Sequence, residues 1–466
     1  MKDFRAQAHR LADWIADYLE HPERFPVLSR VQPGEIRNAL PSAAPEHGES
    51  FDAIFADFER VIVPGLTHWN HPGFFAYFAI TASAPGILAE FLSAALNQQA
   101  MLWRTSPAAT ELEEVTLTWL RTLIGLPSGF EGVIYDTASI ATLHALAAAR
   151  EAAVPDVRAR GLAGGSHRAD VRVYCGEHAH SSVDKAVILL GLGHDSLVRV
   201  SADAEFRMRP DRLAAAIAAD RAAGRIPMAV IATVGSTSST SIDPVQEIAG
   251  ICARERIWLH VDAAYAGVAA MVPGYEWILR GADVADSLVV NPHKWLFTPF
   301  DLSVLYCRRM PVLRQAFALT PEYLKTAEGD AGVRNLMDTG IQLGRRFRAL
   351  KLWMTLRHFG ANGLRAALAE HMRLARTFAA WVDASERFER AAPVPFSVVC
   401  FRLRNGSDDE HARLLDTVNA SGEVFLSHTR LDGRYVLRLA IGNLETREAH
   451  VRRAWDLLNS AARTLT

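Results

Sequence analysis

Short apolar segments alternate with helical segments through the middle of the chain, and this alternation limits the possible fold more than any other feature. One helical segment, rich in Ala and Leu, runs from Thr137 to Arg150. Strands that alternate with helices form a mostly parallel sheet with helices on both faces. The sequence therefore predicts an α/β fold. The apolar segments typical of buried strands are 132–135, 171–175, 228–233, 257–261 and 288–290.

A lysine follows one of these strands in an unusual setting. Lys294 stands between His293 and Trp295, after the strand and a Pro-containing turn. Most lysines lie on solvated faces, which is the ordinary interpretation of a single lysine. Apolar surroundings, however, lower the pKa of an ammonium group and free its amine to attack carbonyl carbons. Lys294 is therefore a candidate for a lysine that forms a Schiff base.

A carboxylate ends another strand. Asp262 follows the apolar run 257–261, where open α/β sheets place their ligands. Taken alone, Asp262 is also compatible with a helix N-cap. A buried carboxylate and a Schiff-base lysine together fit pyridoxal phosphate (PLP). The lysine holds the PLP aldehyde, and the carboxylate keeps the pyridine nitrogen protonated so that the ring accepts electrons.

Two motifs resemble those of a known family, the PLP-dependent group II decarboxylases. Segment 291–295, Asn-Pro-His-Lys-Trp, resembles the cofactor-lysine motif, and segment 260–267, His-Val-Asp-Ala-Ala-Tyr-Ala-Gly, resembles the pyridine-binding motif. Within the family the chain is similar to the aromatic-L-amino-acid decarboxylases, from Trp69 to the C-terminal helix. The resemblance implies the aspartate-aminotransferase-like PLP fold. That fold has a large mixed, mostly parallel sheet domain flanked by helices, a small C-terminal α+β domain and an N-terminal helical segment.

The resemblance also implies a set of cofactor contacts. Hydroxyls and free N–H groups at a helix N-terminus bind phosphate, although alone the segment 137–139 reads as an ordinary capped helix. His180 would stack on the PLP ring and lie near the substrate carboxylate, which makes it catalytic together with Lys294 and Asp262. His178 and His180 lack further ligands, so no metal is expected. The implied cofactor contacts are Thr137, Ala138, Ser139, His180, Thr237, Asp262, Ala264, Asn291, His293, Lys294 and Phe300, the last reaching the neighbouring subunit's phosphate site.

An aromatic stretch, 69–80, packs either in the core or, by the resemblance, against the substrate ring. Ala79-Ile80 replaces a Pro-Thr pair of the family and removes a hydroxyl, and a buried catechol hydroxyl without a partner would cost about 1–3 kcal/mol. Gly344 matches a small residue that leaves room for bulky rings, so Phe, Trp or Tyr are favoured over His or Glu. The substrate-binding candidates are Trp69, Tyr77, Phe78, Ile80, Met101 and Gly344.

The implied activity is decarboxylation of aromatic L-amino acids (Phe, Trp, Tyr or dihydroxyphenylalanine) to amines and carbon dioxide. Leu336 stands where animal members carry a lid tyrosine thought to supply a proton. His180, His293 or a lid water are the remaining proton donors. An oxygen-consuming aromatic acetaldehyde synthase is one alternative, because an apolar replacement of that tyrosine accompanies this chemistry in some relatives. A non-catalytic protein of the same fold is the other, and the intact Lys294, Asp262 and His180 weigh against it.

Composition excludes several classes of protein. The chain has 466 residues, a net charge of −2 and 22% charged residues, typical of a globular protein of two or three domains. It has no basic block for nucleic acid, no apolar run for a membrane and no signal peptide, so we expect a cytoplasmic protein. The four cysteines lie far apart, which indicates neither a disulfide framework nor a zinc cluster.

We predict three parts: an N-terminal helical dimerisation segment at 1–82, a large PLP-binding domain at 83–350 with a lid near 320–340, and a small C-terminal domain at 351–466. The first helices, 4–20 and 51–58, each carry an apolar stripe that must be covered. The resemblance implies a homodimer with shared active sites that acts on a small-molecule amino acid substrate.

Overall fold

The computed structural model describes residues 3–162, 170–319 and 333–464, and the chain forms two compact units. The large unit comprises 80–375 and 392–398, and the small unit comprises 1–79, 376–391 and 399–466. Each unit is described by itself. The division into 1–82, 83–350 and 351–466 stays a prediction.

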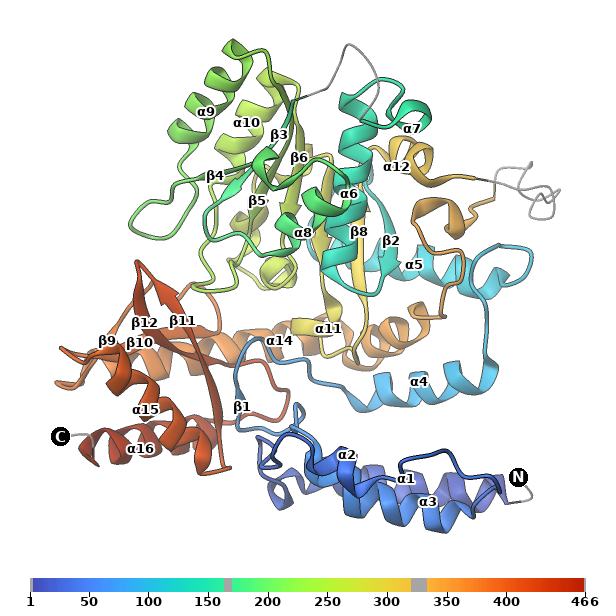
Figure 1. The fold of residues 1–466 in the computed structure, drawn as a ribbon, viewed down its shortest axis with the longest axis vertical. Coiled ribbons are helices and arrows are strands. Elements are labelled where there is room, and N and C mark those ends of the chain that lie inside the picture. Colours follow the sequence, from blue (N-terminus) through green and yellow to red (C-terminus); the bar gives the residue numbers. More distant parts are fainter. Residues whose placement is uncertain (1–2, 163–169, 320–332, 465–466) are drawn as a thin grey trace. The chain divides into compact units, whose positions relative to one another are not determined.

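A seven-stranded sheet in the order β2-β8-β7-β6-β5-β3-β4 forms the centre of the large unit (Figure 1). Strand β8 is antiparallel to both of its neighbours, and all other neighbouring pairs are parallel. Six strands therefore point the same way, and their C-terminal ends share one edge, which we call the carboxyl edge. The strands are β2 (Glu131–Tyr135), β3 (Val171–Gly176), β4 (Leu197–Val200), β5 (Ile226–Thr233), β6 (Trp258–Asp262), β7 (Ser287–Val290) and β8 (Ser303–Cys307).

Helices cover both faces of this sheet. Residues of α6, α8 and α12 share one apolar cluster with the strand residues of one face. On the other face, the Tyr306 hydroxyl donates to the Leu117 carbonyl of α5 at 2.8 Å, and the Tyr174 hydroxyl donates to Asp220 of α9 at 2.7 Å. The helices are α4 (Ala84–Leu96), α5 (Pro107–Leu123), α6 (Ala138–Ala153), α7 (Val157–Arg160), α8 (Ser182–Leu189), α9 (Pro210–Ala222), α10 (Val245–Glu255), α11 (Pro292–Trp295), α12 (Met310–Phe317) and α14 (Ala349–Asp383), which ends in the small unit.

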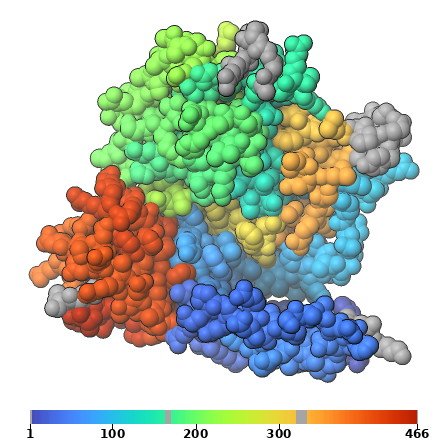
Figure 2. All heavy atoms as spheres, viewed as in Figure 1, coloured from blue at the N-terminus to red at the C-terminus, as the bar shows by residue number. Residues whose placement is uncertain are grey.

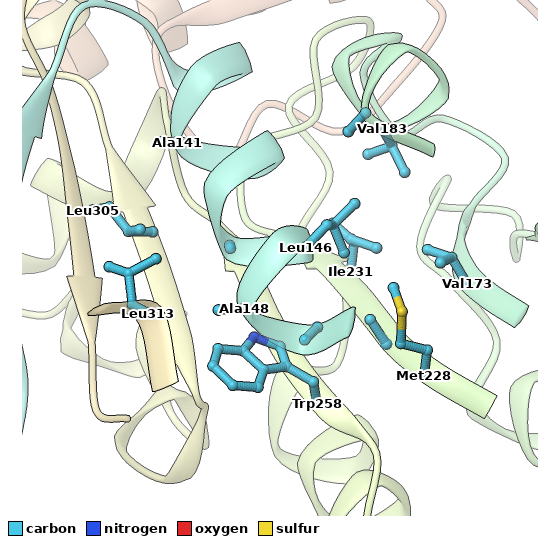
Figure 3. Close-up of a cluster of buried hydrophobic side chains, with 14 of the residues drawn as sticks. Ala141, Leu146, Ala148, Val173, Val183, Met228, Ile231, Trp258, Leu305 and Leu313 are labelled. Atoms are coloured by element: carbon cyan, nitrogen blue, oxygen red, sulfur yellow. The ribbon is translucent and has the colours of Figure 1, made fainter. Parts of the chain in front are cut away.

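The apolar cluster explains why α6 is rich in alanine. Ala141 and Ala148 of α6 belong to this cluster, and Figure 3 shows Leu146 of the same helix beside Ile231. Small side chains let the helix approach the strands closely, and larger residues of the strands then fill the remaining space. In the space-filling view, side chains occupy the spaces that separate the ribbons of this unit (Figure 2). The α/β class predicted from the alternating segments is confirmed.

The small unit contains a five-stranded sheet in the order β1-β11-β12-β10-β9. Strand β1 is parallel to β11, whereas β11 pairs with β12 and β10 with β9 in antiparallel fashion. The strands are β1 (Phe74–Phe75), β9 (Phe388–Arg390), β10 (Val398–Leu403), β11 (Phe425–Leu431) and β12 (Arg434–Ala440). The helices are α1 (Phe4–Glu20), α2 (Glu35–Ala39), α3 (Phe51–Asp57), α15 (Asp408–Ala420) and α16 (Glu448–Thr464).

Two helix ends have clear local causes. Ser50 caps α3, because its hydroxyl accepts a hydrogen bond from the Ala53 N–H at 3.2 Å. The last helix runs to Thr464, since Ala461 and Ala462 continue its buried stripe. Among the helices that the structure describes, none combines the length and the apolar character that crossing a bilayer requires.

Candidate active site

The carboxyl edge collects the catalytic residues predicted from the sequence. Asp262 is the last residue of β6, Lys294 follows β7, and His180 follows β3. Thr137 follows β2 and Thr237 follows β5. Because these strands are parallel, the five side chains lie along one edge of the sheet although they are spread over more than a third of the chain. Open α/β sheets place their ligands at this edge.

Lys294 lies in the short helix α11, which begins after Asn291. Its N–H donates to the Asn291 carbonyl at 2.9 Å. Trp295 is buried, stacks on Tyr265 with ring centroids 4.8 Å apart and donates from Nε1 to His371 at 3.0 Å. The helix is thereby held in the core, while Lys294 itself stays partly accessible. Burial lowers the pKa of the Lys294 ammonium, and the charge of Asp262 opposes that effect.

Asp262 is 8% exposed, so its carboxylate is largely removed from water. One carboxylate oxygen accepts from the Ala264 N–H at 3.1 Å, and its backbone carbonyl accepts from the Val234 N–H at 2.8 Å. The carboxylate also acts electrostatically on Lys294 and His180. The edge therefore holds a cation and a buried anion that influence each other, which is the pair that the sequence predicted.

A buried hydrogen-bond chain supports the segment before Lys294. His293 Nδ1 accepts from the Leu302 N–H at 2.9 Å, and its Nε2 lies 3.2 Å from the Asn291 side chain. Burial lowers the pKa of His293 to about 3, so the ring is neutral near pH 7. The Ser303 hydroxyl donates to the Asn291 side-chain oxygen at 2.6 Å, which leaves the Asn291 amide nitrogen facing His293 Nε2. A ring held neutral in this way is a poor proton donor.

His180 is exposed at the carboxyl edge. Its Nδ1 accepts from the Ser182 N–H at 3.1 Å, which leaves Nε2 to carry the proton of the neutral ring. Desolvation by neighbouring atoms lowers the pKa of His180, the charge of Asp262 acts against this, and that of Lys294 adds to it. His180 is therefore a mostly neutral ring that can donate a hydrogen bond from Nε2 to a bound ligand.

The first turn of α6 offers free donors. Thr137 is the N-cap with an extended backbone, and its N–H donates to Asp136 at 2.6 Å. Over the described residues, the N–H groups of Ala138 and Ser139 meet no acceptor, and both residues are partly exposed. Free N–H groups and the dipole of a 16-residue helix together favour an anion at this end.

The remaining cofactor candidates differ in exposure. Thr237 is exposed in the loop between β5 and α10, and Ala264 is buried beneath the edge. Phe300 is 56% exposed, with its ring centroid 4.9 Å from that of His293. An apolar ring so exposed beside the Lys294 segment is notable, since large apolar side chains are usually buried.

The six substrate-binding candidates divide between the two units. Ile80, Met101 and Gly344 belong to the large unit. Gly344 is exposed, and an added Cβ would lie 3.1 Å from the Gln99 side-chain nitrogen, so a larger residue there displaces Gln99. Met101 packs with Leu102 and Met337.

Trp69, Tyr77 and Phe78 belong to the small unit. Trp69 stacks on Tyr77 with ring centroids 5.9 Å apart, and Tyr77 is exposed with φ of 50°. Phe78 is buried, with the Arg438 guanidinium 5.4 Å from its ring centroid. These aromatic residues both pack locally and present one exposed ring, so the two interpretations of stretch 69–80 are compatible with each other.

The predicted lid near 320–340 lies partly outside the described residues, which resume at 333. Leu336 begins a short 3-10 turn, Leu336–Thr339, and is only 1% exposed. The turn is anchored because the Tyr135 hydroxyl donates to the Thr339 carbonyl. Further along, Arg345 forms a buried ion pair with Glu113 at 2.9 Å. In this structure Leu336 is therefore a core residue of the large unit.

Three supporting residues escaped the sequence interpretation. Glu113 is buried and binds Arg345 and the Ile134 N–H. Ser303 donates to Asn291 at 2.6 Å, and Asp243 accepts two backbone hydrogen bonds. Their partners lie 10 to 232 residues away along the chain, so no local pattern identifies them.

Comparison with known proteins identifies the family of this chain. The model of the pyridoxal-dependent decarboxylase conserved domain matches residues 33–404. An aromatic-L-amino-acid decarboxylase of Sus scrofa is 41% identical, covering 99% of this chain and 97% of the relative. A phenylacetaldehyde synthase of Arabidopsis thaliana is 40% identical, covering 99% of this chain and 96% of the relative.

A solved structure of Oryza sativa TDC with PLP and tryptamine superposes with a TM-score of 0.96 at 37% identity, covering 100% of this chain and 98% of that one. The likeness confirms the aspartate-aminotransferase-like fold, the PLP cofactor class and the family resemblance predicted from the two motifs. The chain belongs to the pyridoxal-dependent decarboxylase family.

Proposed function

We propose that this chain decarboxylates aromatic L-amino acids to the corresponding amines and carbon dioxide. The observation that carries the proposal is the arrangement of Lys294, Asp262 and His180 along one sheet edge, where their charges influence one another. Aromatic substrates or products in the names of the relatives support the substrate class. We expect Phe, Trp, Tyr or dihydroxyphenylalanine to be the substrate.

The residues at the carboxyl edge fit PLP by their chemistry. PLP needs an amine for its aldehyde, an anion for its pyridine nitrogen and hydrogen-bond donors for its phosphate. Lys294 has a lowered pKa, Asp262 is a buried carboxylate, and the N–H groups of Ala138 and Ser139 meet no acceptor elsewhere in the described chain. We assign the remaining contacts to Thr137, His180, Thr237, Ala264, Asn291, His293 and Phe300.

Each catalytic residue has a separate task in this proposal. When bound, PLP supplies an electron sink for the electron pair that is released as carbon dioxide leaves. Asp262 holds a proton on the pyridine nitrogen and so keeps that sink strong. His180 donates a hydrogen bond from Nε2 and orients the substrate carboxylate. Lys294 supplies the amine, and desolvation lowers the pKa of its ammonium form.

We propose that the substrate-binding residues are Trp69, Tyr77, Phe78, Ile80, Met101 and Gly344. Their side chains are mainly apolar or aromatic, which suits phenyl and indole rings. The absence of a side chain at Gly344 leaves room for a bulky ring beside Gln99. This composition supports an aromatic substrate over glutamate or histidine.

We also propose a cytoplasmic homodimer with shared active sites. The four cysteines are buried as free thiols, which suits a reducing compartment. The exposed ring of Phe300, beside the Lys294 segment, supports a contact with a second subunit. Helix α4 supports the same assembly, because Leu88, Phe91 and Leu92 leave an exposed apolar face.

An oxygen-consuming aromatic acetaldehyde synthase is the second candidate activity. Leu336 favours it by its place in the sequence, and a phenylacetaldehyde synthase is among the relatives. The buried position of Leu336 weakens that argument, because a side chain packed in the core does not reach a ligand. Decarboxylation to the amine therefore remains the preferred proposal.

Product analysis tests the proposal. The full-length protein, loaded with PLP, is incubated with Phe, Tyr, Trp, dihydroxyphenylalanine, His and Glu, with and without oxygen, and the products are identified by mass spectrometry. Amines from the aromatic substrates alone are expected. Aldehydes, ammonia and hydrogen peroxide that form only with oxygen would establish the synthase instead. No product from any substrate would indicate a non-catalytic protein.

A further inference from the structure

Asp243 is a buried carboxylate without a cationic partner. It lies between β5 and α10, where it is 6% exposed. Over the described residues, no lysine, arginine or histidine forms an ion pair with it. Burial raises the pKa of Asp243 to about 6. Buried carboxylates are normally paired with a cation, so this residue needs a structural reason.

The contacts of Asp243 supply that reason. One carboxylate oxygen accepts from the Met208 N–H at 2.7 Å, and the other accepts from the Thr233 N–H at 2.8 Å. The Asp243 N–H in turn donates to the Thr233 carbonyl at 2.9 Å. The side chain thus joins the C-terminal end of β5 to the segment around Met208. Both oxygens act as acceptors, a task that a carboxylate performs and an amide does not.

Asp243 follows the loop 234–242, and this loop is held together by hydrogen bonds between its own residues. Val234 and Ile242 form an antiparallel bridge, and the N–H groups of Gly235 and Ser236 both donate to the Ser241 carbonyl at 3.0 Å. The Ser241 hydroxyl donates to the Phe206 carbonyl at 2.8 Å. The loop and the segment 206–208 therefore form one hydrogen-bonded platform, with Asp243 at its base.

The platform lies against the Asp262 segment. The Val234 N–H donates to the Asp262 carbonyl at 2.8 Å. Gly235 has φ of 84°, and an added Cβ would lie 2.5 Å from the Ala266 Cβ. This close approach requires glycine. Thr237 stands exposed on the same loop, three residues after Val234, whose N–H binds the Asp262 carbonyl at the carboxyl edge.

We propose that Asp243 is a positioning residue for the cofactor: by holding both the Thr233 and the Met208 N–H, it fixes the loop that presents Thr237. This inference rests on the contact between Thr237 and PLP in the proposed function. Asp243 itself touches no substrate or cofactor in this account. It acts through the loop, so its effect should appear in PLP retention before it appears in stability.

Asp243→Asn tests the inference in the full-length holoenzyme. The amide keeps the shape but offers one acceptor oxygen, so one N–H loses its partner and faces an NH₂ group. We expect PLP to bind about tenfold more weakly, measured by the loss of cofactor absorbance on dialysis. We also expect amide hydrogen exchange to become faster in residues 234–242.

Asp220→Asn is the matched control. Asp220 is equally buried at 6% exposed, but it lies at the end of α9 just before β5, at the opposite end of that strand from Asp243. It binds Tyr174 at 2.7 Å and Arg225 at 2.8 Å. Its replacement should lower the thermal unfolding temperature without weakening PLP binding. Equal PLP affinity in the Asp243→Asn, Asp220→Asn and unmodified proteins would overturn the inference.

A double-mutant cycle with Thr237→Ala separates positioning from general damage. If Asp243 acts through Thr237, the double variant should have the same PLP affinity as whichever single variant binds PLP less tightly. Additive losses would overturn the inference. Should Asp243→Asn fail to fold, Ser241→Ala replaces it in the same cycle, since it removes the contact with Phe206 at less cost. We expect a roughly threefold loss of PLP affinity for that variant.

These readouts do not depend on decarboxylation. PLP retention and hydrogen exchange are measured without substrate, whereas the proposed function is judged from the products of the unmodified enzyme. A protein that binds PLP through this loop yet forms no amine would contradict the function and support the positioning role. Amine formation by the unmodified enzyme, together with unchanged PLP binding in Asp243→Asn, would support the function and contradict the positioning role.

Discussion

The two edges of the large sheet use buried polar groups in opposite ways. At the amino edge, Asp220 binds Tyr174 and Arg225, and Asp286 accepts from the Leu259 N–H at 2.9 Å with Arg308 at 3.6 Å. At the carboxyl edge, Asp262 and the free N–H groups of α6 have few partners within the chain. The buried carboxylates at the amino edge are paired within the chain, whereas the polar groups at the carboxyl edge are left to bind a ligand.

This difference has a physical reason. A buried polar group without a partner destabilises the fold, so a chain tolerates such groups only where they serve another purpose. The amino edge follows the general rule and contributes to stability. The carboxyl edge departs from it, and the departures coincide with the residues that the two motifs identified. Replacements at the two edges should therefore affect different properties.

The largest effect is expected for Lys294→Arg. Arginine keeps the positive charge but stays protonated, so it cannot bond to the PLP aldehyde. Amine formation should fall by at least about 10³-fold, measured as kcat/KM with an aromatic substrate. Lys185→Ala, an exposed replacement on α8, serves as the control and should keep normal activity. Substantial activity in Lys294→Arg would refute the assignment.

Asp262→Asn should follow in size. A neutral amide cannot hold a proton on the pyridine nitrogen, so kcat should fall by about 10²-fold while the protein stays folded. In the protein without PLP, the pKa of the Lys294 ammonium should also fall further, because the charge that raises it is gone. The pH dependence of Lys294 acylation in the PLP-free protein measures this second effect. An unchanged kcat would show that the two edges do not differ in the way described.

Stability should depend on pH with opposite signs at the two edges. Asp243 has a raised pKa of about 6, so its contribution to stability is greatest below about pH 4 and declines as pH rises through 6. Burial raises the pKa of Asp220, but its hydrogen bonds to Arg225 and Tyr174 lower it by more, so the pKa lies below its usual value. The contribution of Asp220 to stability is therefore present at neutral pH and is lost in acid.

Thermal unfolding of Asp243→Asn and Asp220→Asn at pH 3 and 7 measures this difference. Relative to the unmodified protein, Asp220→Asn should be less stable chiefly at pH 7, by roughly 1–3 kcal/mol, because the lowered pKa of Asp220 confines the loss of its contribution to pH values below about 4. The deficit of Asp243→Asn should instead be greater at pH 3 than at pH 7. Deficits with the same pH trend in both variants would contradict the comparison.

The smallest effects are expected for two buried serines. Ser303→Ala at the carboxyl edge removes the hydroxyl that binds Asn291. It should lower kcat roughly threefold and change the unfolding free energy little. Ser287→Ala at the amino edge removes a hydroxyl shared by His260 and Trp258. It should lower the unfolding free energy by about 1 kcal/mol and leave kcat unchanged. Reversed outcomes would show that the edges are not specialised.

The sequence predicts the sheet edge better than it predicts what supports that edge. Apolar runs and the polar residues that end them are local, so β5, β6 and β7 and the residues Asp262 and Lys294 could be identified from short segments. Glu113 shows the opposite case. Its place in the first half of α5 suggests a helix-dipole role, whereas its actual partner, Arg345, lies 232 residues away. Only folding brings the two together.

Asp243 illustrates the same limit for the site. The segment around it looks like an ordinary polar turn, and neither of its acceptor roles follows from the residues beside it. Its partners, Thr233 and Met208, come from two other elements. Pairs that depend on the register between distant segments carry no periodic pattern, so one sequence by itself does not predict them.

The central claim is that the carboxyl edge binds PLP through Lys294. Borohydride reduction of the yellow holoenzyme, followed by peptide mass spectrometry, tests this claim directly. Reduction should fix the cofactor to the peptide that contains Lys294, with loss of the visible absorbance. A cofactor mass on a peptide containing another lysine, or no adduct in protein that retains its colour, would contradict the account.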